Sequence, residues 1–262
     1  MQSMLEGQHM EVPRMNDFQR GETPTFVSHV KAGLDALAAD NCGILIFSGG
    51  ATKKSRTSLS EGQSYLVGKI RLPRSNNLAK ENNFYQDQTA DSTIDPTKII
   101  VEEYATDSYQ NLLFSLLRFR SHVGAYPRRV TVVTHAFKRE RFLECHFPAV
   151  GLVPQTGTSP VESNDNATVI GINPPPDISP LESLRREGLV YGKKDLYGVA
   201  EDLSSKRAKR GWVPETRADL IASSGCDEVV AQLVCWDGGT GNQWFPRIEE
   251  LPWYYGRSKN SH

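Results

Sequence analysis

Cysteines are few in this 262-residue sequence, and none of them is placed for metal binding. The four cysteines, Cys42, Cys145, Cys226 and Cys235, are far apart and form no Cys-x-x-Cys pair. This pattern disfavours both a structural zinc site and a disulfide framework, so no metal is expected. Reduced thiols of this kind fit a cytoplasmic protein.

Long apolar runs and an excess of one charge are lacking too. No run reaches the roughly 18 residues that a membrane span needs, and the N-terminus has no signal-peptide core. We therefore expect a soluble protein without a membrane span. The formal net charge is -1, and basic clusters occur at residues 53–56 and 206–210. Such clusters are typical of solvated surface, so no nucleic-acid partner is expected.

Recognised catalytic motifs are also lacking. The sequence has no Gly-x-Ser-x-Gly and no His-x-x-x-His, and no nucleophile stands in a recognised Cys-His or Ser-His setting. These absences leave open whether the protein is an enzyme.

A glycine turn between a strand and a helix is the clearest local feature. Residues 43–47 predict a buried strand, residues 48–50 (Ser-Gly-Gly) predict a turn, and a helix is expected to open at Ser58. Ser58 and Glu61 have the spacing of a capping box. Free backbone N–H groups and a helix dipole at such a turn favour an anion or a polar ligand head. Alternatively, the two glycines only permit a tight turn.

Strands and helices alternate along residues 23–191. Apolar spacing predicts a helix from residue 24 to about residue 39, and further strands are expected at residues 98–101, 129–134 and 168–172. The alternation predicts an α/β fold with a parallel sheet covered on both faces.

Polar residues follow each predicted strand. They are residues 48–50, residues 102–108, Thr134 with His135, and Asn173. In parallel sheets the carboxyl ends of the strands share one edge, and ligands bind outside that edge. The sequence therefore predicts a binding site there.

Three side chains at or near this edge could take part in acid–base chemistry. Glu61 and Glu102 could form a carboxylate pair, or could hold a cationic group. Equally, Glu61 could serve only the capping box and Glu102 only a salt bridge. His135 could be a general base, or a hydrogen-bonded structural histidine.

Three further side chains could contact a ligand without reacting. Arg141 could reach a carboxylate or phosphate with two hydrogen bonds. Ser108 and Asn111 stand near a predicted helix start, where they could contact the ligand or only cap the backbone. The edge suits a polar, partly anionic small molecule.

Residues 192–262 differ from the rest of the chain. They hold all four tryptophans and many glycines, prolines and charged residues, with little periodicity. We expect an irregular C-terminal extension that packs on the core, its aromatic residues covering apolar surface; a recognition surface is the alternative. Residues 1–22 are polar and are expected to be disordered.

The order of the motifs resembles the YdcF, SanA and ElyC family, the DUF218 domain. Ser-Gly-Gly-x-Thr, then Ser-Glu, then Glu before a Thr/Ser-x-x-Asn helix start, then Val-Thr-x-x-Phe-x-x-x-Arg follow one another within residues 23–175. The His-Ala-Phe-Lys-Arg segment and the C-terminal extension look like the fungal members. The resemblance implies a Rossmann-like three-layer sandwich, and S-adenosylmethionine binding as in one branch. The matching positions are Ser48, Gly49, Gly50, Thr52, Ser60, Glu61, Glu102, Ser108, Asn111, Thr134 and Arg141.

The chain departs from the family pattern at two places. Lys138 stands where many relatives carry a histidine. Residues 1–22 do not supply the apolar first strand and glycine-bearing loop with which the family begins, so we expect a truncated N-terminus. A missing central strand would leave backbone groups unpaired and open the wall of the pocket.

Three functions follow from these observations. The first is binding of S-adenosylmethionine or a nucleotide-like small molecule at the strand ends. The second is an enzyme acting on a phosphorylated or carboxylated substrate, with Glu102 or His135 as base. The third is a non-catalytic protein that docks a partner through its C-terminal aromatic segment. The oligomeric state is left open.

Overall fold

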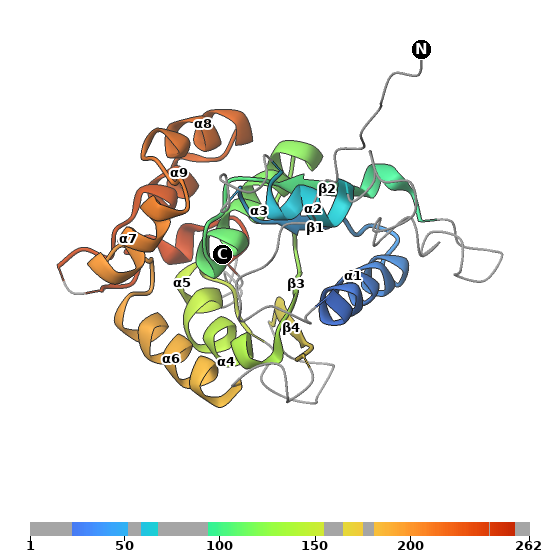
Figure 1. The fold of residues 1–262 in the computed structure, drawn as a ribbon. Helices are drawn as coiled ribbons and strands as arrows, with labels where there is room; N and C mark the ends of the chain where they lie inside the picture. Colours follow the sequence, from blue (N-terminus) through green and yellow to red (C-terminus); the bar gives the residue numbers. More distant parts are fainter. Residues whose placement is uncertain are drawn as a thin grey trace, which may run out of the picture.

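The protein is a mixed α/β fold in a computed structural model that describes residues 23–51, 59–67, 94–154, 165–174, 181–240 and 242–254. Helices outnumber strands along the described chain, and the strands lie among them (Figure 1). The predicted α/β class is therefore confirmed. The elements are α1 (Thr23–Ala38), β1 (Leu45–Ser48), α2 (Glu61–Val67), η2 (Pro96–Lys98), β2 (Ile99–Glu102), α3 (Ser108–Val123), β3 (Val130–Thr134), η3 (Ala136–Lys138), α4 (Arg139–Arg141), the π-helix η4 (Phe142–His146), α5 (Phe147–Ala149), β4 (Ala167–Gly171), α6 (Leu181–Lys194), α7 (Glu201–Lys209), α8 (Glu215–Ser224), α9 (Glu228–Cys235) and η5 (Ile248–Glu250).

The strands pair in parallel, as the alternation of strands and helices predicts. β1 pairs with β2, so that Ser48 lies opposite Glu102, and β3 pairs with β4. Within the described residues these are two separate two-stranded sheets, and no described strand joins β1 to β3. Helix α1 contacts both β1 and β3. The three-layer sandwich stays a prediction.

Two apolar clusters hold the fold together. The larger one joins α3, the segment from Phe142 to Leu152, and β4 to apolar residues of the C-terminal helices. The smaller one lies between α1 and the β1–β2 pair, with Leu34 and Phe47 among its members. Helices α7 to α9 lie on the opposite side of the molecule from α1 (Figure 1).

The region after residue 192 contains three helices that the sequence analysis did not expect. Helices α7, α8 and α9 have 9, 10 and 8 residues. α7 buries only Arg207, and α8 buries only Leu220 and Ser224, so in these two helices too few apolar side chains face the core for a helical period to show. α9 buries four apolar side chains, but over only 8 residues. Trp253 is fully buried and donates from its indole N–H to the backbone carbonyl of Val150, 2.7 Å away.

The helix starts lie slightly away from their predicted positions. α2 begins at Glu61, and the hydroxyl of Ser60 accepts the N–H of Gln63 at 2.9 Å; Ser58 lies outside the described residues. α3 is capped by Asp107, whose carboxylate accepts the N–H of Gln110 at 2.9 Å. No helix in the described ranges is long and apolar enough to cross a membrane.

Candidate functional site

Glu102 joins the ends of β1 and β2. Its side chain is 2% exposed, and one carboxylate oxygen accepts the hydroxyl of Ser48 at 2.5 Å. The other oxygen accepts the N–H groups of Tyr104 at 2.5 Å and Ala105 at 2.9 Å. Burial raises the pKa of Glu102, and these hydrogen bonds oppose the rise. Glu102 therefore stabilises the loop that follows β2, and its oxygens are already occupied.

The Gly49–Gly50 turn uses its own backbone groups internally. The N–H groups of Gly49 and Gly50 donate to carbonyls at the end of β2 and in the loop after it, at 3.1 and 2.6 Å. The first amides of α2, those of Glu61 and Gly62, donate back to the two carbonyls of the turn at 3.1 and 2.9 Å. The prediction that these groups are free for an anion is therefore wrong. Gly49 has a φ of 148°, which a residue with a side chain rarely adopts.

Two carboxylates and one aromatic ring form the outer part of this edge. The hydroxyl of Ser60, itself buried, donates to the Glu103 carboxylate at 3.1 Å. Glu61 is exposed and lies over the turn, where a Cβ added at Gly49 would come 3.2 Å from its carboxylate. Glu103 is exposed, and the neighbouring Tyr104 is 51% exposed. We call Glu61, Glu103 and Tyr104 the acidic rim.

The start of α3 lies against the same edge. The hydroxyl of Ser48 also approaches the backbone carbonyl of Asn111 at 3.4 Å. Ser108 is the first residue of α3 and is half-buried. The structure thus brings the ends of β1 and β2 and the start of α3 together, whereas the predicted ligand residue Thr52 lies outside the described residues.

His135 and Thr134 are placed differently. The His135 ring packs against Phe26 and His29 of α1, with ring centroids 5.6 and 4.8 Å apart, and against Phe137 at 5.0 Å. Burial, then Lys138 and His29, lower the pKa of His135 to about 3, so its ring is neutral at neutral pH. Thr134 accepts the N–H of Ile172 at 2.9 Å. A structural histidine, one of the two possibilities that the sequence left open, accounts for these contacts.

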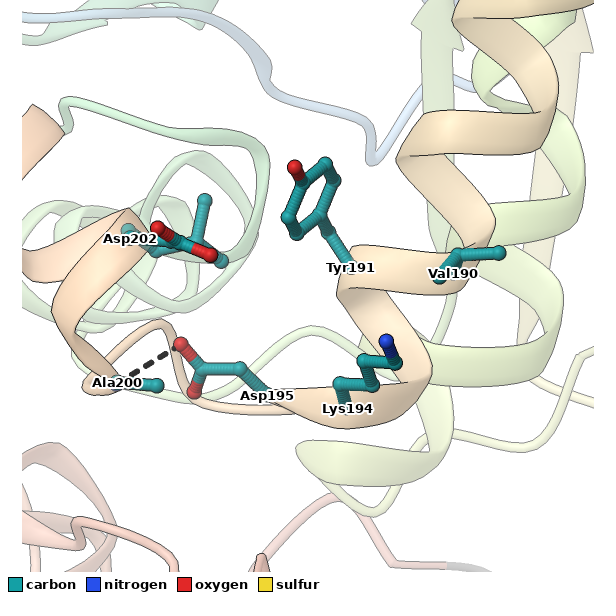
Figure 2. Close-up of a pocket in the computed structure, with 7 residues that line it drawn as sticks. Val190, Tyr191, Lys194, Asp195, Ala200 and Asp202 are labelled. Atoms are coloured by element: carbon teal, nitrogen blue, oxygen red, sulfur yellow. Dashed lines mark hydrogen bonds between the residues drawn. The ribbon is translucent and has the colours of Figure 1, made fainter.

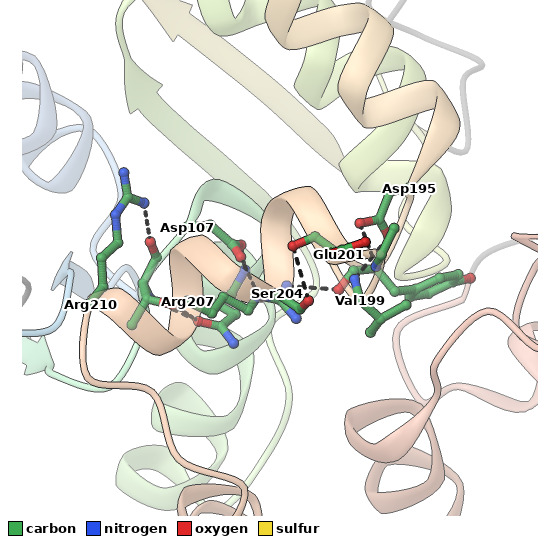
Figure 3. Close-up of polar contacts among 11 residues, drawn as sticks. Asp107, Asp195, Val199, Glu201, Ser204, Arg207 and Arg210 are labelled. Carbon is green, nitrogen blue, oxygen red and sulfur yellow. Dashed lines mark hydrogen bonds and ion pairs between the residues drawn. The ribbon is translucent and has the colours of Figure 1, made fainter.

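The basic cluster at residues 206–210 contributes a buried ion pair. Arg207 is 5% exposed and donates from Nε to the Asp107 carboxylate at 2.5 Å and from Nη2 to the carbonyl of Tyr197 at 2.7 Å. Arg210 donates to the carbonyl of Thr106 (Figure 3). The expectation that this cluster is solvated surface is wrong for Arg207, which ties α7 to the start of α3.

Arg141 lies behind this edge, between α4 and α6. Its guanidinium covers Gly188 of α6, where any side chain would overlap it. Its Nε is buried without a hydrogen-bond partner among the described residues, as are the Tyr109 hydroxyl and both ring nitrogens of His146. The sequence pattern does not distinguish Tyr109 or His146 as functional residues, because an aromatic residue on an apolar helix face and a lone histidine are typical of a protein core.

A separate cleft of about 530 Å³ lies between α6 and α7. Figure 2 shows Tyr191 and Lys194 of α6 facing Asp202 of α7, with Asp195 accepting the N–H of Ala200 at 2.9 Å. No strand-end residue lines it. In the part of the chain that the structure describes, no group of three or more His, Cys, Asp or Glu side chains could hold a metal ion.

One relative of the chain is a yeast protein, and the match covers similar shares of the two chains. The chain is 32% identical over 220 residues to the uncharacterised protein YOR238W of Saccharomyces cerevisiae, a match that covers 70% of this chain and 69% of the yeast protein. No family model matches the chain. No solved structure matches it either. The resemblance to fungal proteins is thus supported, whereas the DUF218 assignment gains no support from a family model.

Proposed function

The chain belongs to the same family as the yeast protein YOR238W, and we propose that it binds a polar small molecule at the carboxyl ends of β1 and β2. S-adenosylmethionine is the first candidate, and a nucleotide-like compound the second, because of the motif resemblance to DUF218 proteins. The structure favours no reaction, since the candidate bases Glu102 and His135 are both buried in internal contacts.

The acidic rim is the observation that carries this proposal. Glu61 and Glu103 place two exposed carboxylates at one edge, with the exposed ring of Tyr104 directly after Glu103. S-adenosylmethionine carries a sulfonium and an ammonium group, which carboxylates attract, and an adenine that can stack on an aromatic ring. Tyrosine faces also attract cations directly. The chemistry of the rim therefore suits the two cationic groups and the adenine of this ligand.

The floor beneath the rim supports the same proposal. The carboxylate of Glu102 and the amides of the Gly49–Gly50 turn are hydrogen-bonded internally. A floor held in this way does not have to reorganise when a ligand arrives, which lowers the free-energy cost of binding. Ligand recognition would then fall to the rim side chains.

The melting temperature of the full chain with and without S-adenosylmethionine tests the proposal. A ligand at 100 times its Kd adds about 2.7 kcal/mol, or about 5–10 °C for a protein of this size. Glu103→Gln and Tyr104→Ala should lose the shift while the unliganded protein melts unchanged. Glu249→Gln, at an exposed carboxylate far along the chain, is the matched control and should keep it.

S-adenosylhomocysteine sharpens the test because it lacks the sulfonium charge. It should bind to the native protein more weakly than S-adenosylmethionine does. The Glu103→Gln variant should bind the two compounds about equally, and both weakly. A shift of the same size in the rim variants and the control would contradict the proposal, and so would the absence of any shift in a cooperatively melting protein.

A further inference from the structure

Three side chains from α3, α4 and η4 present buried polar atoms that have no hydrogen-bond partner in the described chain. They are the hydroxyl of Tyr109, Nε of Arg141 and both ring nitrogens of His146. Tyr109 and His146 are each 6% exposed, and their ring centroids are 6.2 Å apart. Buried polar groups in native proteins are nearly always hydrogen-bonded, so a set of four without partners indicates a bound group.

The backbone at this place is unusual as well. Arg141 is followed directly by the five-residue π-helix η4, whose last residue is His146. Pro148 has no N–H with which to continue the ordinary helical ladder back to Glu144, which accommodates the wider turn. Segments of π-helix are rare and are frequent at functional sites.

The charge at this place is positive. Arg141 is half-buried, and its buried Nε has no hydrogen-bond partner among the described residues. The carboxylate that acts on its charge, Asp107, already accepts hydrogen bonds from Nε of Arg207 at 2.5 Å (Figure 3) and from the N–H of Gln110 at 2.9 Å. A buried donor without an acceptor is destabilising. An anion would supply both an acceptor and a negative charge, whereas a metal cation would be repelled.

The hydrogen-bonding groups at this place match an anion too. Burial and then the charge of Arg141 lower the pKa of His146 to about 3, so its neutral ring offers one N–H donor. The Tyr109 hydroxyl and Nε of Arg141 offer two more, and hydrogen bonds to a charged oxygen are stronger than those between neutral groups.

We propose that Tyr109, Arg141 and His146 form a buried oxyanion-binding site that takes a phosphate or a carboxylate group. The inference goes beyond the acidic rim and does not depend on it, because the rim suits a cationic ligand and these three residues suit an anionic one. Arg141 acts electrostatically on His146, and its guanidinium lies against Gly188 of α6.

Binding of inorganic phosphate and of acetate to the full chain tests the site, with calorimetry as the readout. The two anions tell a phosphate site from a carboxylate site. Tyr109→Phe, Arg141→Gln and His146→Asn should each weaken binding of the preferred anion at least tenfold. The same changes at exposed positions, Tyr191→Phe, Arg128→Gln and His122→Asn, should leave it unchanged. Glu103→Gln should also leave it unchanged, which separates this test from the test of the rim.

The ¹⁵N signals of the His146 ring give a second readout that needs no variant at that position. They should report a neutral ring in the anion-free protein and should move when phosphate or acetate is added. Equal binding to the site variants and to their controls would show an adventitious ion only and would overturn the proposal. The absence of binding by both anions to the native protein, with unmoved ring signals, would overturn it as well.

Discussion

Arg207 is buried and Arg141 is half-buried, and the two arginines have opposite surroundings. Arg207 is paired with the Asp107 carboxylate and with the carbonyl of Tyr197. Nε of Arg141 has no hydrogen-bond partner in the described chain, and neither do the Tyr109 hydroxyl and the His146 ring nitrogens. The same residue type thus serves two purposes. A buried side chain whose polar groups are all hydrogen-bonded stabilises the fold. A group of side chains whose buried polar atoms lack partners is a candidate ligand site.

The β1–β2 edge belongs with Arg207 in this comparison. Glu102 has a buried carboxyl group, and both of its oxygens accept hydrogen bonds from the chain. The residue that the sequence nominated most strongly for ligand binding is therefore part of the architecture. The exposed rim beside it and the unsatisfied atoms behind it are the better places to look for ligands.

Glu102→Ala should have the largest effect on stability. It leaves the Ser48 hydroxyl and the N–H groups of Tyr104 and Ala105 without their acceptor, and each unsatisfied buried group costs about 1–3 kcal/mol. We expect a loss of about 4 kcal/mol in the free energy of unfolding, measured by urea denaturation. Glu249→Ala, at an exposed carboxylate far along the chain, is the control. Equal losses in the two variants would show that Glu102 is not the structural carboxylate described above.

Arg207→Met should come second. It removes the cation that pairs with Asp107 and leaves Oδ2 of that carboxylate and the Tyr197 carbonyl without this donor. Breaking a buried pair from one side costs about 3 kcal/mol. Lys206→Met, at the exposed neighbour, should change the urea midpoint little. Hydrogen exchange should also speed up at the start of α3, because Asp107 caps that helix; unchanged exchange there would contradict the role of the pair.

Acid should destabilise the protein through its buried histidines. The pKa values of His135 and His146 are lowered from 6.5 to about 3. The unfolded chain therefore takes up protons between pH 6.5 and 3 that the folded chain does not, and stability falls as the pH falls through that range. Each histidine contributes a slope of at most about 1.4 kcal/mol per pH unit. Urea denaturation at several pH values in anion-poor buffer should show this slope, and His146→Leu should reduce it; an unchanged slope would contradict the assignment.

Arg141→Met should have the smallest effect, and of the opposite sign to Arg207→Met. It removes a half-buried guanidinium whose Nε has no hydrogen-bond partner among the described residues, so the stability should be unchanged or higher by about 1 kcal/mol. The two arginines thus form a matched pair, since the same substitution is made at each. A loss at Arg141 as large as the loss at Arg207 would mean that Arg141 serves the fold, and the difference between the two regions would disappear.

The sequence located the strands and the first helix closely. The apolar runs at residues 98–101, 129–134 and 168–172 correspond to β2, β3 and β4, and the helix predicted from residue 24 to about 39 corresponds to α1. These predictions succeed because the spacing of apolar residues within a short segment indicates whether that segment forms a helix or a strand. Helices α7 and α8 were missed because they bury few apolar residues each, so their period is weak; α9 buries four apolar residues but is only 8 residues long.

The sequence also identified the strand-end residues, but not their partners. It placed Ser48 and Glu102 at one edge, and the parallel register puts them opposite each other. It could not tell that Glu102 accepts hydrogen bonds from Ser48, 54 positions away, and from the loop after β2. Tyr109 and His146 belong to no sequence motif. Whether their polar atoms find hydrogen-bond partners depends on residues that lie near them only in the folded chain.

By itself the sequence determined the α/β class, the parallel pairing and the kinship with the yeast protein, because each of these depends on patterns along the chain. Only the tertiary structure decided which charged groups are satisfied. Arg207 meets Asp107 across 100 positions of sequence, whereas Arg141 meets no carboxylate that is not already engaged. The physical reason is that burial and the identity of a partner are set by distant segments packing together, and the cost of an unpaired charge exists only once water has been excluded.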